Sequence, residues 1–200
     1  MMGTRSLTIF TEHDSKTPIE IVVMYRQFDG YISQHGKELG EFLQQFDEVV
    51  NGLVGDNRKL ANGMACLAAQ TIMHFKGRIK NHNHNERVFN PTTGTMGSPI
   101  REGHHEGGIY LYPAGSRDVG EEYIYYISEK KGRIHLRACI AGCPERTYVK
   151  PHLPACDDEI IWEGFTDNWN LDDALAMEKH IHDRKEAEWK ARVAEQELTQ

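Results

Sequence analysis

The chain has 200 residues, 39% of them hydrophobic, and a formal net charge of −7 at pH 7. This length is enough for one compact domain with its own core. The acidic balance argues against a broad surface for duplex nucleic acid, because phosphates require a stripe of Lys and Arg. No stretch approaches the roughly 18 apolar residues of a membrane-spanning helix, and residues 1–10 lack the pattern of a secretory signal. We therefore expect a cytoplasmic protein without a membrane partner.

Several short segments have the composition of β-strands. Residues 6–11 and 19–27 are rich in β-branched and aromatic side chains and are separated by a polar stretch, so they predict a hairpin. The second of these segments carries apolar side chains on both faces, which indicates a central strand. Residues 108–112, 122–128 and 133–140 predict an antiparallel meander, and residues 159–165 predict a sixth strand.

Helical spacing of apolar residues predicts the remaining elements. It occurs over residues 35–50 and, more strongly, over residues 64–79. Asn170 is well placed to cap a charged helix that continues to about residue 197. The predicted fold class is therefore α+β, a mainly antiparallel sheet of five to six strands with two helices packed on one face and a long C-terminal helix.

The domain organisation follows from changes in composition. An α+β domain is expected over residues 1–168, with a His/Asn/Gly-rich insertion at 80–107. This insertion is long for a connection, so it is functional, is mobile, or carries a small element of its own. A charged helix follows over residues 169–200. Its second half keeps mainly Trp189 and Val193 as apolar side chains, so it either projects into solvent or pairs with another chain, giving a homo-oligomer through this helix.

Arginine and tyrosine residues gather at the ends of the predicted strands. An arginine offers a planar fork for phosphate or carboxylate, and a tyrosine offers a ring for stacking. The set predicts a pocket for a small anionic, nucleotide-like ligand, formed by Arg5, Tyr25, Arg26, Asp29, Tyr31, His35, Tyr112, Arg117 and Asp118. The alternative is that Arg26–Asp29 and Arg117–Asp118 are ion pairs at hairpin corners, with the tyrosines covering the sheet.

Two groups of residues could bind a metal, and we expect no other cofactor. Cysteine and histidine, the ligand types of structural zinc sites, occur within eighteen residues at Cys139, Cys143, His152 and Cys156. The spacing is looser than the usual C-x2-C pairs, so the alternative is a set of ordinary reduced thiols. The insertion contains His82, His84, His104 and His105, but no H-E-x-x-H motif accompanies them.

The sequence contains none of the common catalytic motifs. G-x-S-x-G, P-loop and G-x-G-x-x-G patterns are absent at the predicted strand–helix junctions. His35 could serve as a base near Asp29, although a histidine at a helix start is more often a surface group. We therefore assign no catalytic residue and favour a binding protein over an enzyme.

Four runs of the sequence resemble a known group of proteins. MGTRSLTIF, MYRQFDGYISQHGKEL, GMACLAAQ and GGIYLYPAGSRDVGEEYIY are similar to a family of small uncharacterised phage and prokaryotic proteins. Members open with MGTRS and carry a Y-R/H-x-W/F-D-G-Y segment. The similarity covers roughly residues 2–128, and Ile32 stands where many members have Pro. The resemblance implies provenance, including a host cytoplasm for a phage protein, rather than a mechanism.

Three functional hypotheses remain open. The leading one is a phage-type protein that captures a small anionic, nucleotide-like ligand and so counteracts host defence signalling. The second is a metal-dependent hydrolase acting on nucleotides, with the histidines of the insertion and Asp29, Asp118 or Glu121. The third is a protein-interaction module that uses the C-terminal helix.

Overall fold

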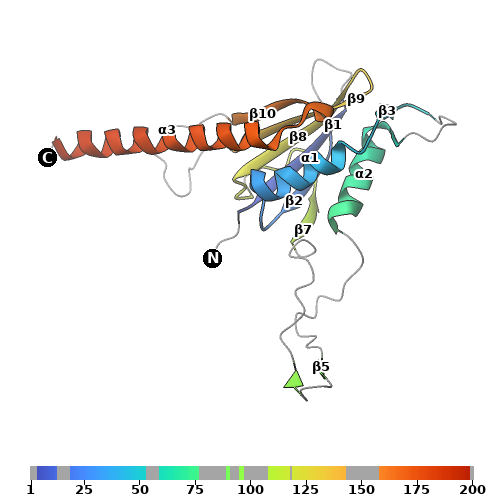
Figure 1. Ribbon diagram of the computed structural model, residues 1–200, viewed down its shortest axis with the longest axis horizontal. Helices are drawn as coiled ribbons and strands as arrows, with labels where there is room; N and C mark the ends of the chain where they lie inside the picture. Colours follow the sequence, from blue (N-terminus) through green and yellow to red (C-terminus); the bar gives the residue numbers. More distant parts are fainter. Residues whose placement is uncertain are drawn as a thin grey trace.

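A six-stranded sheet forms the centre of the molecule (Figure 1). The computed structural model describes residues 4–12, 19–52, 59–76, 89–90, 95–96, 108–117, 119–142 and 158–198. The strand order is β10-β9-β8-β1-β2-β7, and only β1 and β8 are parallel neighbours. The strands are β1 (Ser6–Glu12), β2 (Ile19–Arg26), β7 (Ile109–Tyr112), β8 (Tyr123–Lys130), β9 (Arg133–Ile140) and β10 (Glu159–Phe165). The α+β prediction is therefore confirmed.

Among the described residues, three helices and shorter elements complete the fold. The helices are α1 (Lys37–Leu43), α2 (Gly63–Lys76) and α3 (Leu171–Leu198), with a π-helical turn η1 (Ile32–Gly36) before α1 and a 3-10 turn η2 (Thr166–Asn168) before α3. Two minor sheets pair β3 (Glu48–Val50) with β4 (Leu60–Asn62), and β5 (Phe89–Asn90) with β6 (Thr95–Met96). In the described part of the chain, no helix is long and apolar enough to cross a membrane.

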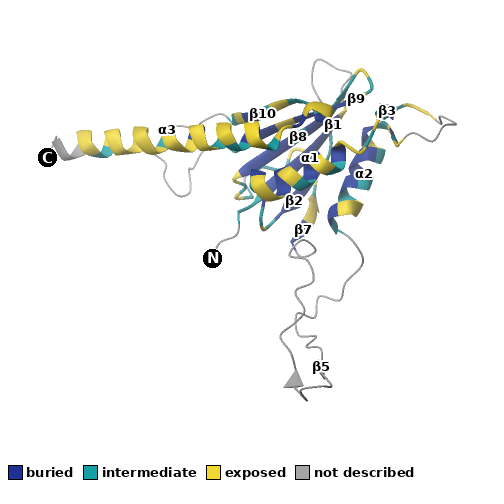
Figure 2. Ribbon diagram, in the orientation of Figure 1, coloured by how far each residue is buried: buried dark blue, intermediate teal, exposed yellow. Residues whose placement is uncertain are grey.

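Strand alternation gives the sheet two different faces. On the face that we call the helix face, Phe10 and Met24 pack against α1 and α2 in the main core. Figure 2 shows the buried sides of these helices turned towards the sheet. Leu39, Leu67 and Phe75 supply the helical side of this core, and each is 2% exposed or less.

The opposite face, which we call the tyrosine face, carries a smaller core. Leu7, Ile9, Val23, Tyr25 and Ile124 form it, and Val119 packs against them. Val119 belongs to the segment between β7 and β8, which must pass β2 and β1 to reach its place in the sheet. We call residues 113–121 the crossover segment; contacts through Val119 place it over the tyrosine face.

Two predicted elements were wrong in detail. The helix predicted over residues 35–50 ends at Leu43, because residues 48–50 pair with β4 and the Val49 N–H donates to the Gly132 carbonyl at 2.7 Å. The meander predicted from residue 108 onward is also incomplete. The β8–β9 and β9–β10 pairs are antiparallel neighbours, but β7 lies at the far edge against β2.

The long helix α3 begins as the sequence predicts and then leaves the domain. The Asn170 side chain accepts hydrogen bonds from the N–H groups of Asp172 and Asp173 at 3.0 and 3.3 Å. Ala174 and Ile181 are buried, so the first half of the helix belongs to the main core. Figure 1 shows the second half extending beyond the sheet, and Trp189 there is 59% exposed.

Candidate functional site

The residues predicted to form one pocket lie on both faces of the sheet. Tyr25 and Arg26 are consecutive in β2, so their side chains point in opposite directions. Arg26 contacts His35 on the helix face, whereas Tyr25 belongs to the smaller core on the tyrosine face. Arg5, Tyr25 and Tyr112 therefore lie together on the tyrosine face, and Arg26 lies with His35 on the other. Arg117 shares the tyrosine face but contacts Glu20 and Tyr126. Asp118 lies outside the described residues.

On the helix face, Arg26 and His35 form a buried polar network. The Arg26 Nη1 group lies 2.8 Å from His35 Nδ1, and His35 Nε2 lies 2.8 Å from the Thr8 hydroxyl. A guanidinium only donates hydrogen bonds, so Nδ1 must accept, and the neutral ring must carry its hydrogen on Nε2. Nε2 then donates to Thr8. Arg26 also contacts the Glu38 carboxylate at 3.4 Å.

The turn after β2 sets the position of this histidine. Asp29 adopts a φ of 57°, and its carbonyl accepts the His35 N–H at 3.3 Å. The Tyr31 carbonyl accepts the Gly36 N–H at 3.3 Å, which belongs to the π-helical turn. Asp29 and Tyr31 thus contribute backbone groups to this arrangement. Because His35 is 0% exposed, a ligand does not reach its ring in this conformation.

On the tyrosine face, three tyrosines from two strands form an aromatic group. The ring centroid of Tyr25 lies 5.2 Å from that of Tyr112 and 6.0 Å from that of Tyr110. Tyr25 is 7% exposed, but Tyr110, on the edge strand β7, is 47% exposed. The exposed ring of Tyr110 can therefore accept a flat ligand, while the other two tyrosines support it.

A cation lies on each side of this aromatic group. Burial raises the pKa of the Tyr25 hydroxyl. The positive charge of Arg5 partly offsets that rise in pKa and the negative charge of Glu121 adds to it, so both of these groups lie near the Tyr25 ring. The Lys76 ammonium lies 5.8 Å from the Tyr110 ring centroid and donates to the Ile109 carbonyl at 3.1 Å. We call Arg5, Tyr25, Tyr110, Tyr112 and Lys76 the cation–tyrosine strip.

A glycine makes room for one of these cations. Gly120 adopts a φ of 82°, and a Cβ atom at this position would overlap Nη1 of Arg5. The Arg5 carbonyl also accepts the Glu122 N–H at 2.9 Å, which joins the end of the crossover segment to the chain just before β1. The backbone of Arg5 is thus held by this hydrogen bond, and the absence of a side chain at Gly120 leaves space for its guanidinium.

Arg117 is the fourth predicted residue on the tyrosine face, and it is neutralised by an acidic neighbour. It forms an ion pair with Glu20 of β2, and its guanidinium lies 5.9 Å from the Tyr126 ring centroid. Burial opposes ionisation of Glu20, but hydrogen bonds from Arg117 and the Gly115 N–H outweigh it and lower the pKa of this carboxyl. Arg117 therefore tethers the crossover segment.

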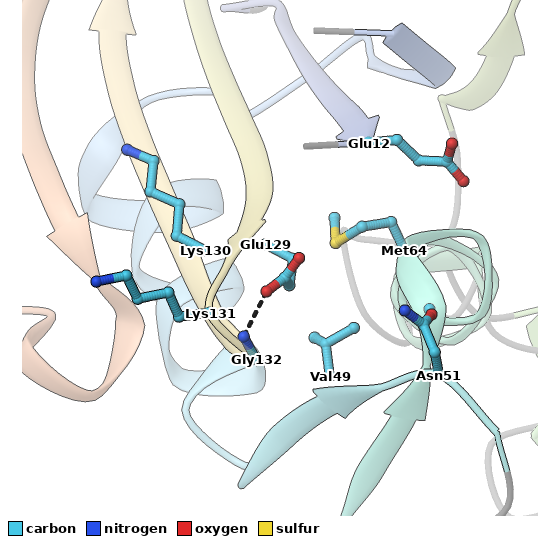
Figure 3. Close-up of a pocket in the computed structure, with 9 residues that line it drawn as sticks. Glu12, Val49, Asn51, Met64, Glu129, Lys130, Lys131 and Gly132 are labelled. Atoms are coloured by element: carbon cyan, nitrogen blue, oxygen red, sulfur yellow. Dashed lines mark hydrogen bonds between the residues drawn. The ribbon is translucent and has the colours of Figure 1, made fainter. Parts of the chain in front are cut away.

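A cavity of about 750 Å³ lies at the opposite end of β1, where the β8–β9 hairpin meets the start of α2 (Figure 3). Val49 and Met64 line it with apolar groups, and Glu12 and Glu129 contribute carboxylates. Lys130 and Lys131 also belong to the lining, but Figure 3 shows both side chains directed away from these carboxylates. The acidic groups make this cavity a poor place for an anion.

The predicted zinc ligands are only partly visible. Cys143, His152 and Cys156 lie outside the described residues, as do the histidines of the insertion. Cys139 is 1% exposed, and burial, with a smaller contribution from Asp158, raises the pKa of its thiol to about 12. Among the described residues, no group of three or more His, Cys, Asp or Glu side chains could hold a metal ion. The zinc site stays a prediction.

Sequence reasoning missed Tyr110 and Lys76. Tyr110 had a usable signal, since it alternates with Tyr112 in the segment IYLY and must share its face. Lys76 had none, because its approach to Tyr110 depends on how the end of α2 meets β7. Comparison of the chain with protein-family models, curated proteins and solved structures returned no match.

Proposed function

We propose that this protein binds a small anionic, nucleotide-like ligand on the cation–tyrosine strip. The observation that carries the proposal is the exposed ring of Tyr110, which lies between the buried Tyr25 ring and the Lys76 ammonium. Stacking of a base on an aromatic side chain is worth about 1–3 kcal/mol, and cations add attraction for phosphate. The ligand would stack on Tyr110 and place its anionic group against Arg5 or Lys76.

The pairing of charges favours the cation–tyrosine strip over the surrounding surface as the place where an anion binds. Arg117 already pairs with Glu20, and Arg26 on the other face already contacts Glu38. Within the described part of the chain, neither Arg5 nor Lys76 has an ion-pair partner, so both charges are available to a ligand. An added anion therefore gains a charge-assisted contact without first breaking an existing pair.

The same features support capture rather than catalysis. Tyrosine rings and cations hold a flat anion, and no step of bond cleavage is needed for that task. In the phage setting that the sequence resemblance suggests, such capture would withhold a nucleotide signal from a host defence system. A captured ligand should leave the protein chemically unchanged, whereas the hydrolase alternative requires cleaved product.

Titration with adenosine 5′-monophosphate tests the proposal. We expect Tyr110→Ala to weaken binding by about 1–3 kcal/mol, roughly 5- to 150-fold in Kd, because the stacking surface is removed. Isothermal titration calorimetry gives the Kd, and mass spectrometry of the released ligand shows whether it is intact.

Trp189→Ala is the matched control for this experiment. It removes an exposed aromatic side chain on α3, far from the strip, and should leave the Kd unchanged. Equal affinities of the wild type and the Tyr110→Ala variant would show that the ligand does not stack on this ring. Release of dephosphorylated nucleoside would favour the hydrolase.

A further inference from the structure

We infer that the ligand of the cation–tyrosine strip carries two anionic groups, one that contacts Arg5 and one that contacts Lys76. This inference rests on the proposed function and adds the number of the charges. It follows from the positions of Arg5 and Lys76 at opposite ends of the strip, with the tyrosines between them.

The strand order fixes the distance between the two ends. Tyr25 pairs with Leu7 of β1 on one side and with Tyr110 of β7 on the other. Neighbouring strands lie about 4.8 Å apart, so β1 and β7 are about 10 Å apart across β2. Arg5 precedes β1 directly, and Lys76 reaches the outer edge of β7.

One phosphate does not reach both cations. Charge-assisted hydrogen bonds to phosphate oxygens are about 2.7–2.9 Å long, so a single phosphate bridges only cations that lie close together. At the separation set by three strands, Arg5 and Lys76 each require an anionic group of their own. The aromatic ring of the ligand would then rest on Tyr110.

The two cations approach the strip from different parts of the fold. Arg5 lies beside Gly120 of the crossover segment, whereas Lys76 is the last residue of α2 and comes around the edge of the sheet. They are anchored independently, Arg5 through its backbone carbonyl and Lys76 through the hydrogen bond from its ammonium to the Ile109 carbonyl. A variant of one cation should therefore leave the other in place.

Two probes test whether the strip prefers a ligand with two anionic groups to a ligand with one. Adenosine 3′,5′-bisphosphate and adenosine 5′-monophosphate share a base and differ in the number of phosphates. We expect the wild-type protein to bind the bisphosphate at least tenfold more tightly, and Arg5→Ala and Lys76→Ala each to remove this advantage. Calorimetric Kd values for both probes measure it.

Control variants and outcomes decide between the two proposals. Lys76→Arg should restore the advantage, and Lys37→Ala, which removes an exposed lysine of α1, should not change it. Equal affinities for both probes, with Tyr110→Ala still weakening them, would overturn this inference and leave the proposed function intact. The inference would also be overturned if both Arg5→Ala and Lys76→Ala still bound the bisphosphate more tightly than the monophosphate. Binding of neither probe to the wild type would overturn both.

Discussion

Arg26 shows how a single residue position changes the interpretation of a site. Its sequence neighbours suggested a solvent-facing ligand contact, but the structure leaves it 2% exposed between His35 and Glu38. The alternation rule alone separates Arg26 from Tyr25, so this division could have been predicted from the strand assignment. The partner of the buried arginine could not, because His35 reaches it through a π-helical turn that no sequence pattern signals.

Replacing Arg26 should therefore affect stability more than binding. We expect Arg26→Ala to cost about 3–5 kcal/mol in the free energy of unfolding, because it leaves Glu38 and the His35 Nδ1 atom without their cationic partner. Urea denaturation measures the change.

Two further measurements serve as controls for Arg26→Ala, one on an exposed arginine and one on a double variant. Arg192→Ala, on the exposed half of α3, should change stability by no more than about 0.5 kcal/mol. Combining Arg26→Ala with His35→Ala should cost less than the sum of the single changes, because both remove the same contact. Additive effects would contradict the network.

The crossover segment is the element that shapes the tyrosine face. Glu20 of β2 accepts the Gly115 N–H and pairs with Arg117, so one carboxylate holds two residues of the segment. Val119, on the same segment, packs its apolar side chain against the smaller core. Loss of the Glu20 charge should therefore loosen the cover of this core.

This tether predicts a pH dependence of stability. The pKa of Glu20 is lower in the folded protein than in the unfolded chain, where it is about 4.3, so its ionised form stabilises the fold. The contribution is complete above about pH 5 and is lost as the pH falls through the lowered folded-state pKa. We expect Glu20→Gln to lower Tm at pH 7, with the difference from the wild type narrowing towards pH 3.

The difference in Tm between the wild type and Glu20→Gln excludes the contributions of the other acidic groups. Glu159 and Glu163 also have lowered pKa values from nearby basic side chains, and both are present in the two proteins. A difference in Tm that is as large at pH 3 as at pH 7 would contradict the tether. Differential scanning calorimetry at several pH values gives the required curves.

The elements themselves were mostly predictable, but their arrangement was not. The strands over residues 159–165 and the Asn170 cap follow from local composition and hydrogen-bonding chemistry, and both are confirmed. The position of β7 depends on contacts with β2, which is distant in the chain, and local periodicity contains no such information. For the same reason the approach of Lys76 to Tyr110 could not be predicted, whereas alternation with Tyr112 could have placed Tyr110 on the tyrosine face.

At the scale of the whole molecule, α3 combines an anchored half with an exposed one. The Tyr123 hydroxyl donates to Glu178 at 2.6 Å, and Lys185 contacts Glu159 at 2.7 Å. From residue 186 to residue 195 every side chain except Val193 is exposed. Pairs such as Glu186–Lys190, at 2.7 Å, support the helix from its own surface.

Removing the end of α3 should leave the domain folded. We expect a protein that ends at Glu188 to keep its Tm within about 2 °C of the full chain, because the deleted part does not extend the core. Ile181→Ala, in the anchored half, should instead cost about 2–5 kcal/mol. Thermal unfolding tests both, and a large loss on truncation would contradict the division of the helix.

The same pair of proteins tests the predicted homo-oligomer. If α3 joins two copies through its exposed half, light scattering should give a larger mass for the full chain than for the shortened one. Equal masses would remove the helix as the contact between copies.

The single parallel pair in the sheet has a consequence for synthesis of the protein. β1 is translated early, but its partner β8 begins at Tyr123. One edge of β1 therefore stays unpaired until most of the chain has left the ribosome. Until then its apolar side chains, Leu7, Ile9 and Phe10, have only the β2 side of the sheet to join. Such an exposed apolar edge favours aggregation. Translation that stops before β8 should therefore yield insoluble fragments rather than a smaller folded protein.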